Sequence, residues 1–442
     1  MQSDWPIVPV ADCCDLIVDC VNKTAPVVES TTPFKMIRTT NVRNGFIDLS
    51  DCRFVDEATF RTWTRRASVL DGDVVLTREA PIGEVGLVRG NGKIFLGQRL
   101  MQYRANRALL APRFLCYAFL SPQLQHQFGA HEGSGSVVSH IRVGDCSKFK
   151  IPLPPLSVQQ AIAELLGAID ERVLLLRQTN ATLESIAQAL FKSWFIDFDP
   201  VRAKAEGREP EGMDAATAAL FPAEFEESAL GVVPAGWQVR QVREVVADVF
   251  DGPHATPAEA TEGPAFLGIK NLTGTALDLG QIRHIAEADY AQWTRRVTPK
   301  TNDIVFSYEA ALGLFALIPP ALRCCLGRRL ALVRAKPVDG TPHFWFHQFV
   351  GAPFQRTLTK HTVQGATVNR IALKEFPSFP VLEPGAGPRR AFEAAAAPLW
   401  ARIHANQQQA LALSELRDTL LPRLISGKLR LPEAQAMMES TP

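Results

Sequence analysis

Apolar residues recur every seven positions between Ser157 and Phe195. One series consists of Ile162, Ile169, Leu176, Leu183 and Leu190, and a second series follows each member by four residues. This is the a/d repeat of a coiled coil, so the pattern predicts one long helix over residues 157–195. At about 1.5 Å per residue the helix would extend roughly 58 Å, which is too long to be stable without a partner.

A second copy of the pattern lies between residues 388 and 425 and supplies that partner. Its apolar positions are offset from the first by 230 residues: Phe392, Leu399, Leu413 and Leu420. Each helix keeps one asparagine in the seam, Asn180 in the first and Asn406 in the second. A polar seam residue can fix the register of a coiled coil. A solvated break in the seam is an equally good interpretation. The pattern therefore predicts two long helices that form a coiled coil with each other.

The same offset relates the rest of the chain, so the duplication is not confined to the helices. The tetrapeptide that begins at Trp63 recurs at Trp293, and the GQRL that begins at Gly97 recurs as GRRL at Gly327. Short β-type runs, turn signals and a helical stretch over residues 112–128 indicate an α/β (α+β) fold. We predict globular domains over residues 1–152 and 236–384. The first helix and an ordered crossover would occupy residues 153–235, and the distal helix and tail residues 385–442.

Composition places the chain among ordinary globular proteins, with 46% hydrophobic and 21% charged residues. No apolar run of about 18 residues is present, and the N-terminus lacks the order of a signal peptide. The eight cysteines include no CxxC pair, which favours reduced thiols. We therefore expect a cytoplasmic protein without a membrane segment. The net charge of +1 is unusual for a nucleic-acid binder, so a basic surface would have to be local.

Motifs for catalysis are missing. The GNGK at residues 90–93 lacks the rest of a phosphate loop, and His131 and Glu132 have no second histidine for a zinc helix. Asp170 and Glu171 are adjacent, so on a helix they would point apart, and we expect them on a solvated face. These observations predict no catalytic residue and no metal site.

Side chains suited to recognition gather instead near strand ends and in glycine-containing loops. Arginine and lysine can contact guanine in the major groove, and asparagine and glutamine can contact adenine. The candidate DNA contacts of the first domain are Arg38, Thr40, Asn41, Arg43, Arg78, Gln98, Arg99, Ser134, Ser136 and His140. Those of the second domain are Lys270, Asn271, Tyr308, Arg328, Gln364, Thr367, Asn369 and Arg370.

Several of these candidates have a structural alternative. Asn41 and Asn271 are shared between the copies, which favours a role in a turn over base reading. Four arginines are also shared between the copies, which suits either phosphate contact or surface salt bridges: Arg65, Arg66, Arg295 and Arg296. The copies differ at two pairs of positions, where half-site preferences could arise: His140 against Arg370, and Gln98 against Arg328. Trp63 and Trp293 are expected in the core.

Three stretches give the chain a family resemblance: IPLPPLSVQQ from Ile151, ALFKSWFIDFDPVRAKAEG from Ala189, and LSELRDTLLPRLISGKL from Leu413. Together with the duplicated plan, they resemble the specificity subunit of type I restriction-modification systems. One departure is PVLEPGAG from Pro380, where the first copy has PLPPLSVQ.

The resemblance implies two target-recognition domains held by antiparallel helices, each reading one half of a bipartite site in double-stranded DNA across an unread gap. It also implies two modification subunits, which bring S-adenosylmethionine and methylate adenine, and restriction subunits that use ATP and Mg²⁺. This chain would bind no cofactor itself. Lengthening the helix by a heptad near Thr179 should then lengthen the gap, and exchanging residues 237–382 should change one half-site. The alternatives are a helical scaffold without readout, and a specificity partner of a fused nuclease-methylase.

Overall fold

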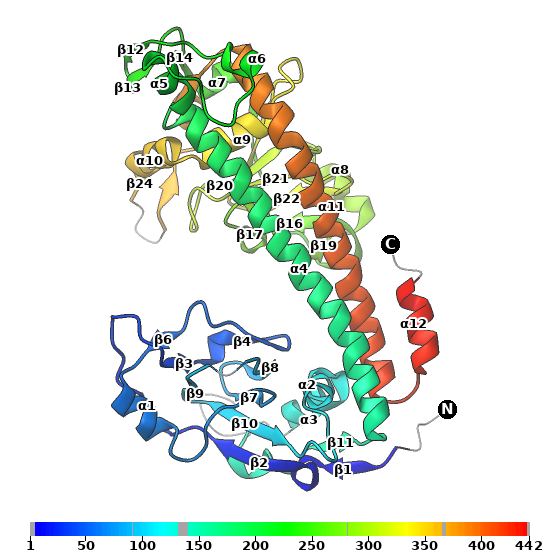
Figure 1. Cartoon of the computed structure of the whole chain (residues 1–442). Coiled ribbons are helices and arrows are strands. Elements are labelled where there is room, and N and C mark those ends of the chain that lie inside the picture. The colour runs from blue at the N-terminus through cyan, green and yellow to red at the C-terminus, as the bar shows by residue number, and fades with distance from the viewer. Residues whose placement is uncertain (1–4, 91, 131–139, 281, 365–367, 440–442) are drawn as a thin grey trace. The chain divides into compact units, whose positions relative to one another are not determined.

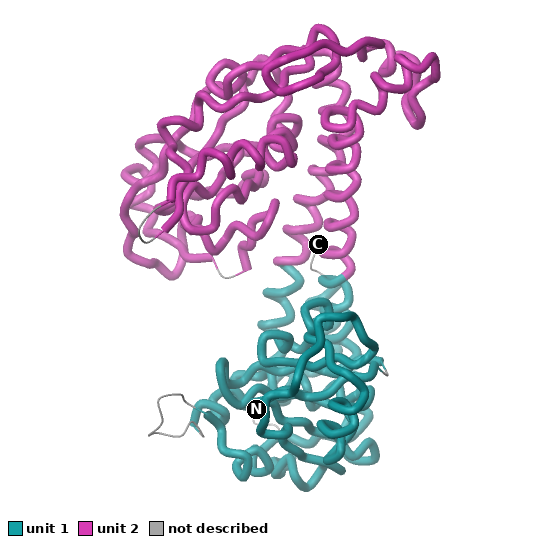
Figure 2. The backbone as a smooth tube through the Cα atoms, turned by 90° about the vertical axis from the view of Figure 1, so that its left-hand side faces the viewer, with its two compact units in different colours: residues 1–174, 412–442 teal, residues 175–411 magenta. Residues whose placement is uncertain are grey.

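The computed structural model describes residues 5–90, 92–130, 140–280, 282–364 and 368–439. The chain divides into two compact units, one of residues 1–174 with 412–442 and one of residues 175–411 (Figure 2). The division passes through both long helices, so each unit contains a globular part and a segment of both helices.

The first unit is built on a four-stranded antiparallel sheet in the order β2-β10-β7-β8 (Figure 1). Its strands are β2 (Cys14–Asp19), β7 (Val74–Arg78), β8 (Ile82–Leu87) and β10 (Leu100–Ala105). A three-stranded sheet has β3 (Lys35–Ile37) between the antiparallel β6 (Arg53–Phe54) and the parallel β9 (Ile94–Leu96). Two short ladders pair β4 (Val42–Arg43) with β5 (Phe46–Ile47) and β1 (Ile7–Pro9) with β11 (Lys150–Pro152).

Three helices accompany these sheets: α1 (Glu57–Trp63), α2 (Pro112–Leu120) and α3 (Pro122–Ala130). The single helical stretch expected over residues 112–128 is therefore two helices. Ser121 between them is extended, with φ −66° and ψ 147°, because the residue before a proline is pushed out of the helical region. The core between helices and sheet includes the edge-to-face rings of Tyr103 and Phe119, 4.9 Å apart.

The second unit repeats this plan. Its four-stranded sheet has the order β15-β23-β20-β21, with β15 (Val246–Asp251), β20 (Ile304–Ser307), β21 (Phe315–Leu317) and β23 (Leu330–Ala335). Its three-stranded sheet contains β16 (Ala260–Leu267), β19 (Arg283–His284) and β22 (Cys324–Leu326), and β16 and β22 are again parallel. The further ladders are β17 (Leu272–Thr273) with β18 (Ala276–Leu277), β14 (Gln238–Gln241) with β26 (Pro380–Glu383), and β24 (Thr362–Val363) with β25 (Arg370–Ile371).

These sheets are accompanied by the helices α7 (Val242–Val245), α8 (Tyr290–Trp293), α9 (Pro342–Val350) and α10 (Ala352–Lys360). The last two, like β22 and β23, occupy the spans of their counterparts in the first unit shifted by 230 residues. The structure thus confirms the predicted pair of α/β domains of one fold. Trp63 and Trp293 lie partly buried against small apolar clusters of their domains.

Two helices of 40 residues each, α4 (Leu156–Phe195) and α11 (Ala386–Ile425), confirm the predicted coiled coil. They are antiparallel, because Asp170 contacts Arg417, Asn180 contacts Asn406, and Phe191 contacts Phe392. Both asparagines are paired inside the seam, so the solvated-break interpretation is wrong. The solvated position expected for Asp170 is also wrong, since this carboxylate is buried and bonded to Arg417, whereas Glu171 is exposed.

The segment after α4 is ordered, as expected. It forms α5 (Asp199–Ala205), α6 (Ala215–Ala218) and a hairpin of β12 (Phe225–Ser228) and β13 (Gly231–Pro234). Phe221 anchors it by packing its ring against Trp194 and Trp237. At the distal end, Gly427 adopts a φ of +68° just after α11, and α12 (Leu431–Glu439) follows. Within the described part of the chain, no helix has the length and apolar character needed to cross a membrane.

Candidate nucleic-acid interface

In the first domain, three chain segments meet at one end of the four-stranded sheet. They are residues 78–81, which begin at the last residue of β7, residues 97–99 before β10, and residues 140–141. We call this group the first tip. The backbone N–H of Arg78 donates to the carbonyl oxygen of Arg99 (2.8 Å), and that of Ile141 donates to the carbonyl oxygen of Arg78 (3.0 Å). The guanidinium of Arg78 returns a bond to the Ile141 carbonyl at 2.9 Å. Three loops distant in sequence are thereby joined.

The second domain has the same arrangement, which we call the second tip: residues 308–311, 327–329 and 369–371. The backbone N–H of Tyr308 donates to the Arg329 carbonyl (3.2 Å), and that of Ile371 donates to the Tyr308 carbonyl (2.8 Å). A further bond joins the Ala310 N–H to the Asn369 carbonyl (3.3 Å). The two tips therefore share one hydrogen-bonding pattern.

Both tips contain strained backbone at matching positions. Ala80 and Arg99 have φ values of +49° and +72°, and their counterparts Ala310 and Arg329 have +64° and +74°. Residues with a side chain rarely adopt this left-handed conformation, which costs on the order of 1–3 kcal/mol at each position. The strain recurs in both domains, so the loop shape that it produces is a shared property of the tips.

A carboxylate holds each strained arginine. Nε of Arg99 lies 2.8 Å from Oε2 of Glu79, and Nε of Arg329 lies 3.2 Å from Oε2 of Glu309. Glu79, Glu309 and Arg329 were not among the residues chosen from the sequence. The repeat of Glu79-Ala80 at Glu309-Ala310 was a usable signal, but nothing in the linear sequence showed that these acids face the arginines 20 residues later.

Each domain has a second matched ion pair. Arg66 is bonded to Asp19 through Nη1 and Oδ1 at 2.5 Å, and Arg296 lies 3.3 Å from Asp251. This supports the salt-bridge interpretation for Arg66 and Arg296, while Arg65 and Arg295 are exposed. In the second domain Tyr308 also donates to Asp251, at 3.0 Å. Burial, reinforced by the Asp251 carboxylate, raises the pKa of Tyr308 well above its ordinary value, so its hydroxyl stays protonated.

Asn41 and Asn271 serve the same turn in both domains. Oδ1 of Asn41 accepts from the backbone N–H of Arg38 (2.8 Å) and its Nδ2 donates to the Asp51 carbonyl (3.2 Å). Asn271 bonds Gly268 and Asp278 in the same way. Both side chains are buried and their polar atoms are engaged, which supports the turn interpretation over base reading.

The other candidates from this corner lie next to the tip, because the Gly97 N–H donates to the carbonyl of Ile37, the residue before Arg38. Arg38 bonds Asp51, and Arg43 bonds Glu84 at 2.7 Å. Thr40 and Lys270 are exposed. These side chains border the tips without belonging to them.

The tips themselves bring together most of the remaining candidates. Arg78, Gln98, Arg99 and His140 belong to the first, and Tyr308, Arg328, Asn369 and Arg370 to the second. Arg328, Asn369 and Arg370 are exposed, as is the nearby Gln364, whereas Gln98 and His140 are half-buried. Ser134, Ser136 and Thr367 lie outside the described residues.

Comparison with known proteins matches residues 35–185 to the family described as type I restriction modification DNA specificity domain. This part of the chain is a type I specificity domain. It contains the first tip and most of α4.

Other proteins are similar to this chain over more than the matched residues 35–185. The type I restriction enzyme MjaIX specificity subunit of Methanocaldococcus jannaschii is 24% identical, over 82% of this chain and 78% of its own length. The HindI specificity subunit of Haemophilus influenzae is 23% identical, over 82% of this chain and 88% of its own. The crystal structure of a type I restriction-modification S subunit from M. genitalium shares the fold, with a TM-score of 0.52, 15% identity and 96% of each chain covered.

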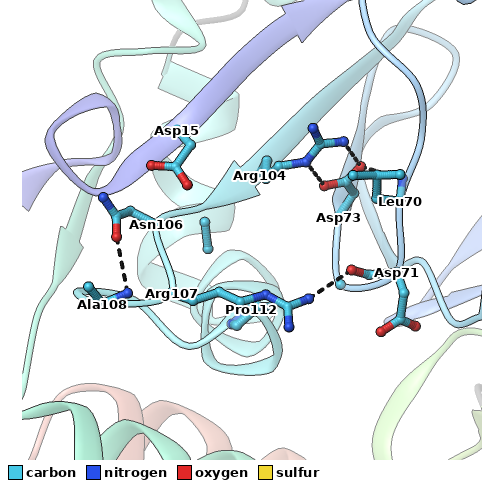
Figure 3. Close-up of a pocket in the computed structure, with 11 residues that line it drawn as sticks. Asp15, Leu70, Asp71, Asp73, Arg104, Asn106, Arg107, Ala108 and Pro112 are labelled. Atoms are coloured by element: carbon cyan, nitrogen blue, oxygen red, sulfur yellow. Dashed lines mark hydrogen bonds and ion pairs between the residues drawn. The ribbon is translucent and has the colours of Figure 1, made fainter.

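The specificity domain also contains a cavity of about 470 Å³. It lies at the opposite end of β10 from the first tip, where Arg104 is paired with the buried Asp73 at 2.8 Å and Arg107 reaches the Asp71 carbonyl at 3.0 Å (Figure 3). Arg334 and Asp303 repeat the first of these pairs in the second domain, at 2.6 Å. The shared pair ties the sheet to the preceding loop, so this cavity is separate from the candidate interface.

Proposed function

We propose that the chain is the DNA-specificity subunit of a type I restriction-modification complex, in which each domain reads one half of a bipartite, gapped site. One observation carries the proposal. The two tips share two backbone hydrogen bonds, their strained residues and their carboxylate clamps, yet their side chains differ at three matched pairs: Arg78 and Tyr308, Gln98 and Arg328, and His140 and Arg370.

A shared frame with different side chains suits base reading. Contacts to phosphate carry no sequence information, so two domains that only held the DNA backbone would need no difference at these positions. Contacts to base edges must differ if the half-sites differ. The variable side chains comprise three guanidinium groups, one amide, one phenol hydroxyl and one imidazole. Among them, arginine can read guanine and glutamine can read adenine in the major groove. A scaffold without readout would give no reason for this pattern.

The recognition domains would comprise residues 1–152 and 236–384. The intervening residues 153–235, with 385–442, would form the spacer that sets the gap and docks two modification subunits. Leu175 and Ile186 on α4 are about half exposed and offer apolar contacts for docking. The subunit would be cytoplasmic and non-catalytic. The modification subunits would bind S-adenosylmethionine and methylate adenine, and restriction subunits would use ATP and Mg²⁺.

Methylome sequencing tests the proposal directly. The modification partner is expressed in a host with or without this chain, and adenine methylation is mapped. Methylation at one gapped, asymmetric motif only when the chain is present is the expected result. If the motif set is the same in both cultures while the modification subunit is expressed, the specificity role is refuted. Exchange of residues 237–382 for those of a relative should then change one half-site and leave the other.

A further inference from the structure

We propose that residues 98 and 328 are the matched base-reading positions of the two domains. Arg328 would select guanine in one half-site and Gln98 would select adenine in the other. This inference rests on the proposed function and assigns its specificity to one side chain in each domain.

The backbone on both sides of each position is fixed. Before it, the N–H of Gly97 donates to the Ile37 carbonyl (2.8 Å), and that of Gly327 donates to the Leu267 carbonyl (2.7 Å). After it, the Arg99 carbonyl accepts from the N–H of Arg78, the last residue of β7. The Arg329 carbonyl accepts from the N–H of Tyr308, the residue after β20. Positions 98 and 328 therefore sit on a one-residue projection held at both ends.

Glycine is required beside the projection because the chain passes so close to its neighbour. A Cβ on Gly97 would lie 2.8 Å from the Ile37 carbonyl oxygen, and one on Gly327 would lie 2.5 Å from that of Leu267. Both distances are shorter than any normal contact. The left-handed arginine on the other side, clamped by Glu79 or Glu309, completes the turn. A rigid backbone turn of this kind lowers the conformational entropy that is lost when its side chain binds.

The side chains at positions 98 and 328 have groups that can hydrogen-bond to base edges. The Arg328 guanidinium is exposed, and it can donate two hydrogen bonds to O6 and N7 of guanine. The Gln98 amide can pair with N6 and N7 of adenine. Its Oε1 lies 3.4 Å from the hydroxyl of Thr24, a weak contact that the amide can exchange for a base. The clamped arginines, Arg99 and Arg329, are the same in both domains, so they suit contact with DNA phosphates, which does not depend on the base sequence.

The test is methylome sequencing of Arg328→Gln and Gln98→Arg, each in the full complex. Arg328→Gln should replace a guanine by an adenine at one position of one half-site and leave the other half unchanged, with discrimination altered by about 5- to 150-fold. Gln98→Arg should make the reverse change in the other half. Arg323→Gln, the matched control at the opposite end of β22, removes the same charge and should leave the motif intact.

Two further results keep the test decisive. Arg328→Lys retains a donor to guanine and should keep the wild-type motif with weaker methylation. If the wild type methylates a gapped motif but both Arg328 variants leave every position unchanged, the assignment is overturned while the specificity role stands. If both folded variants lose methylation at all sites equally, Arg328 contacts phosphate and the assignment is again overturned. A wild type without any dependent motif would instead refute the specificity role.

Discussion

Asn406 and Asn180 meet directly in the seam between α11 and α4. Nδ2 of Asn406 donates to Oδ1 of Asn180 at 2.8 Å, and Nδ2 of Asn180 donates to the carbonyl oxygen of Ile403 at 3.2 Å. Only 2% of Asn406 is exposed. The repeat-related positions carry Leu176 and Ala410. The asparagine pair therefore forms between α4 and α11 in one register, and a shift by a heptad would leave both amides unpaired.

Removing either asparagine should destabilise the seam. Asn180→Leu leaves the buried Asn406 amide without its partner, which costs roughly 1–3 kcal/mol. The double variant Asn180→Leu/Asn406→Leu should lose less than the sum of the two single changes, because no polar group is then stranded. Urea unfolding midpoints of the purified chain measure both effects. The exposed Gln178→Ala serves as the control, and additive losses would contradict the pairing.

Loss of a second polar contact in the seam should lower the stability of the chain more. The buried Asp170 accepts from Arg417 Nη1 at 2.9 Å and from the Tyr117 hydroxyl at 2.6 Å. Arg417→Met leaves a buried carboxylate without its counter-charge, so we expect a loss of about 3–5 kcal/mol.

The matched control is Arg113→Met, whose partner Glu171 is exposed on the same helix. An exposed pair contributes about 0–1 kcal/mol, so this variant should unfold near the wild-type midpoint. Equal losses in the two variants would show that burial of Asp170 has no energetic consequence. Thermal melting of each variant gives the comparison.

The long helices were predictable because a heptad repeat is a local, periodic signal. The offset of 230 residues then predicted that the two domains have the same fold. What the sequence could not show is which partners a polar residue meets across the chain. Asp170 looked like a solvated helical residue, yet Arg417 and Tyr117, far away in sequence, enclose it.

The candidate interface was predictable in its residue types and in several positions, but not in its construction. Arg99 and Gln98 have side chains suited to DNA contact, whereas the sequence does not show that Glu79 faces Arg99. Its role depends on a left-handed Arg99 that brings the guanidinium to it. Backbone strain of this kind leaves no pattern in a single sequence, although its repetition in both domains makes it visible in the structure.

Acid should weaken the second domain through His347. This residue is 1% exposed, and its Nε2 accepts from the Trp400 indole N–H at 3.1 Å. Burial, with a smaller contribution from His343, lowers its pKa to about 3. The unfolded chain binds a proton near pH 6.5 and the folded chain does not, so stability is unaffected above that value and falls between pH 6.5 and about 3.

The loss should approach about 1.4 kcal/mol for each pH unit within this window. His347→Gln keeps an acceptor for Trp400 and cannot be protonated, so its melting temperature should fall less between pH 7 and pH 5 than that of the wild type. Comparison of each protein with itself at pH 8 removes the direct cost of the substitution. Parallel melting curves for the two proteins over the whole range would refute this assignment.

The last prediction concerns the spacer, and the asparagine pair determines how it must be tested. A heptad inserted in α4 alone would separate Asn180 from Asn406, so seven residues must be added both after Thr179 and after Asn406. Antiparallel pairing then continues through the insert. The helices grow by about 10 Å, which corresponds to roughly 3 base pairs of DNA. If the helices set the gap, the methylated motif should contain a gap longer by about that number.

The insertion should also lower the amount of methylation, for a geometric reason. Seven residues turn an α-helix to within about 20° of its starting face, whereas 3 base pairs rotate the duplex by roughly 100° at about 10.5 base pairs per turn. The second half-site is therefore presented out of phase, and the DNA must twist to meet it. The single insertion in α4 is the control, since it should abolish methylation by breaking the seam. An unchanged gap with the paired insertion would mean that the helices do not measure the distance between half-sites.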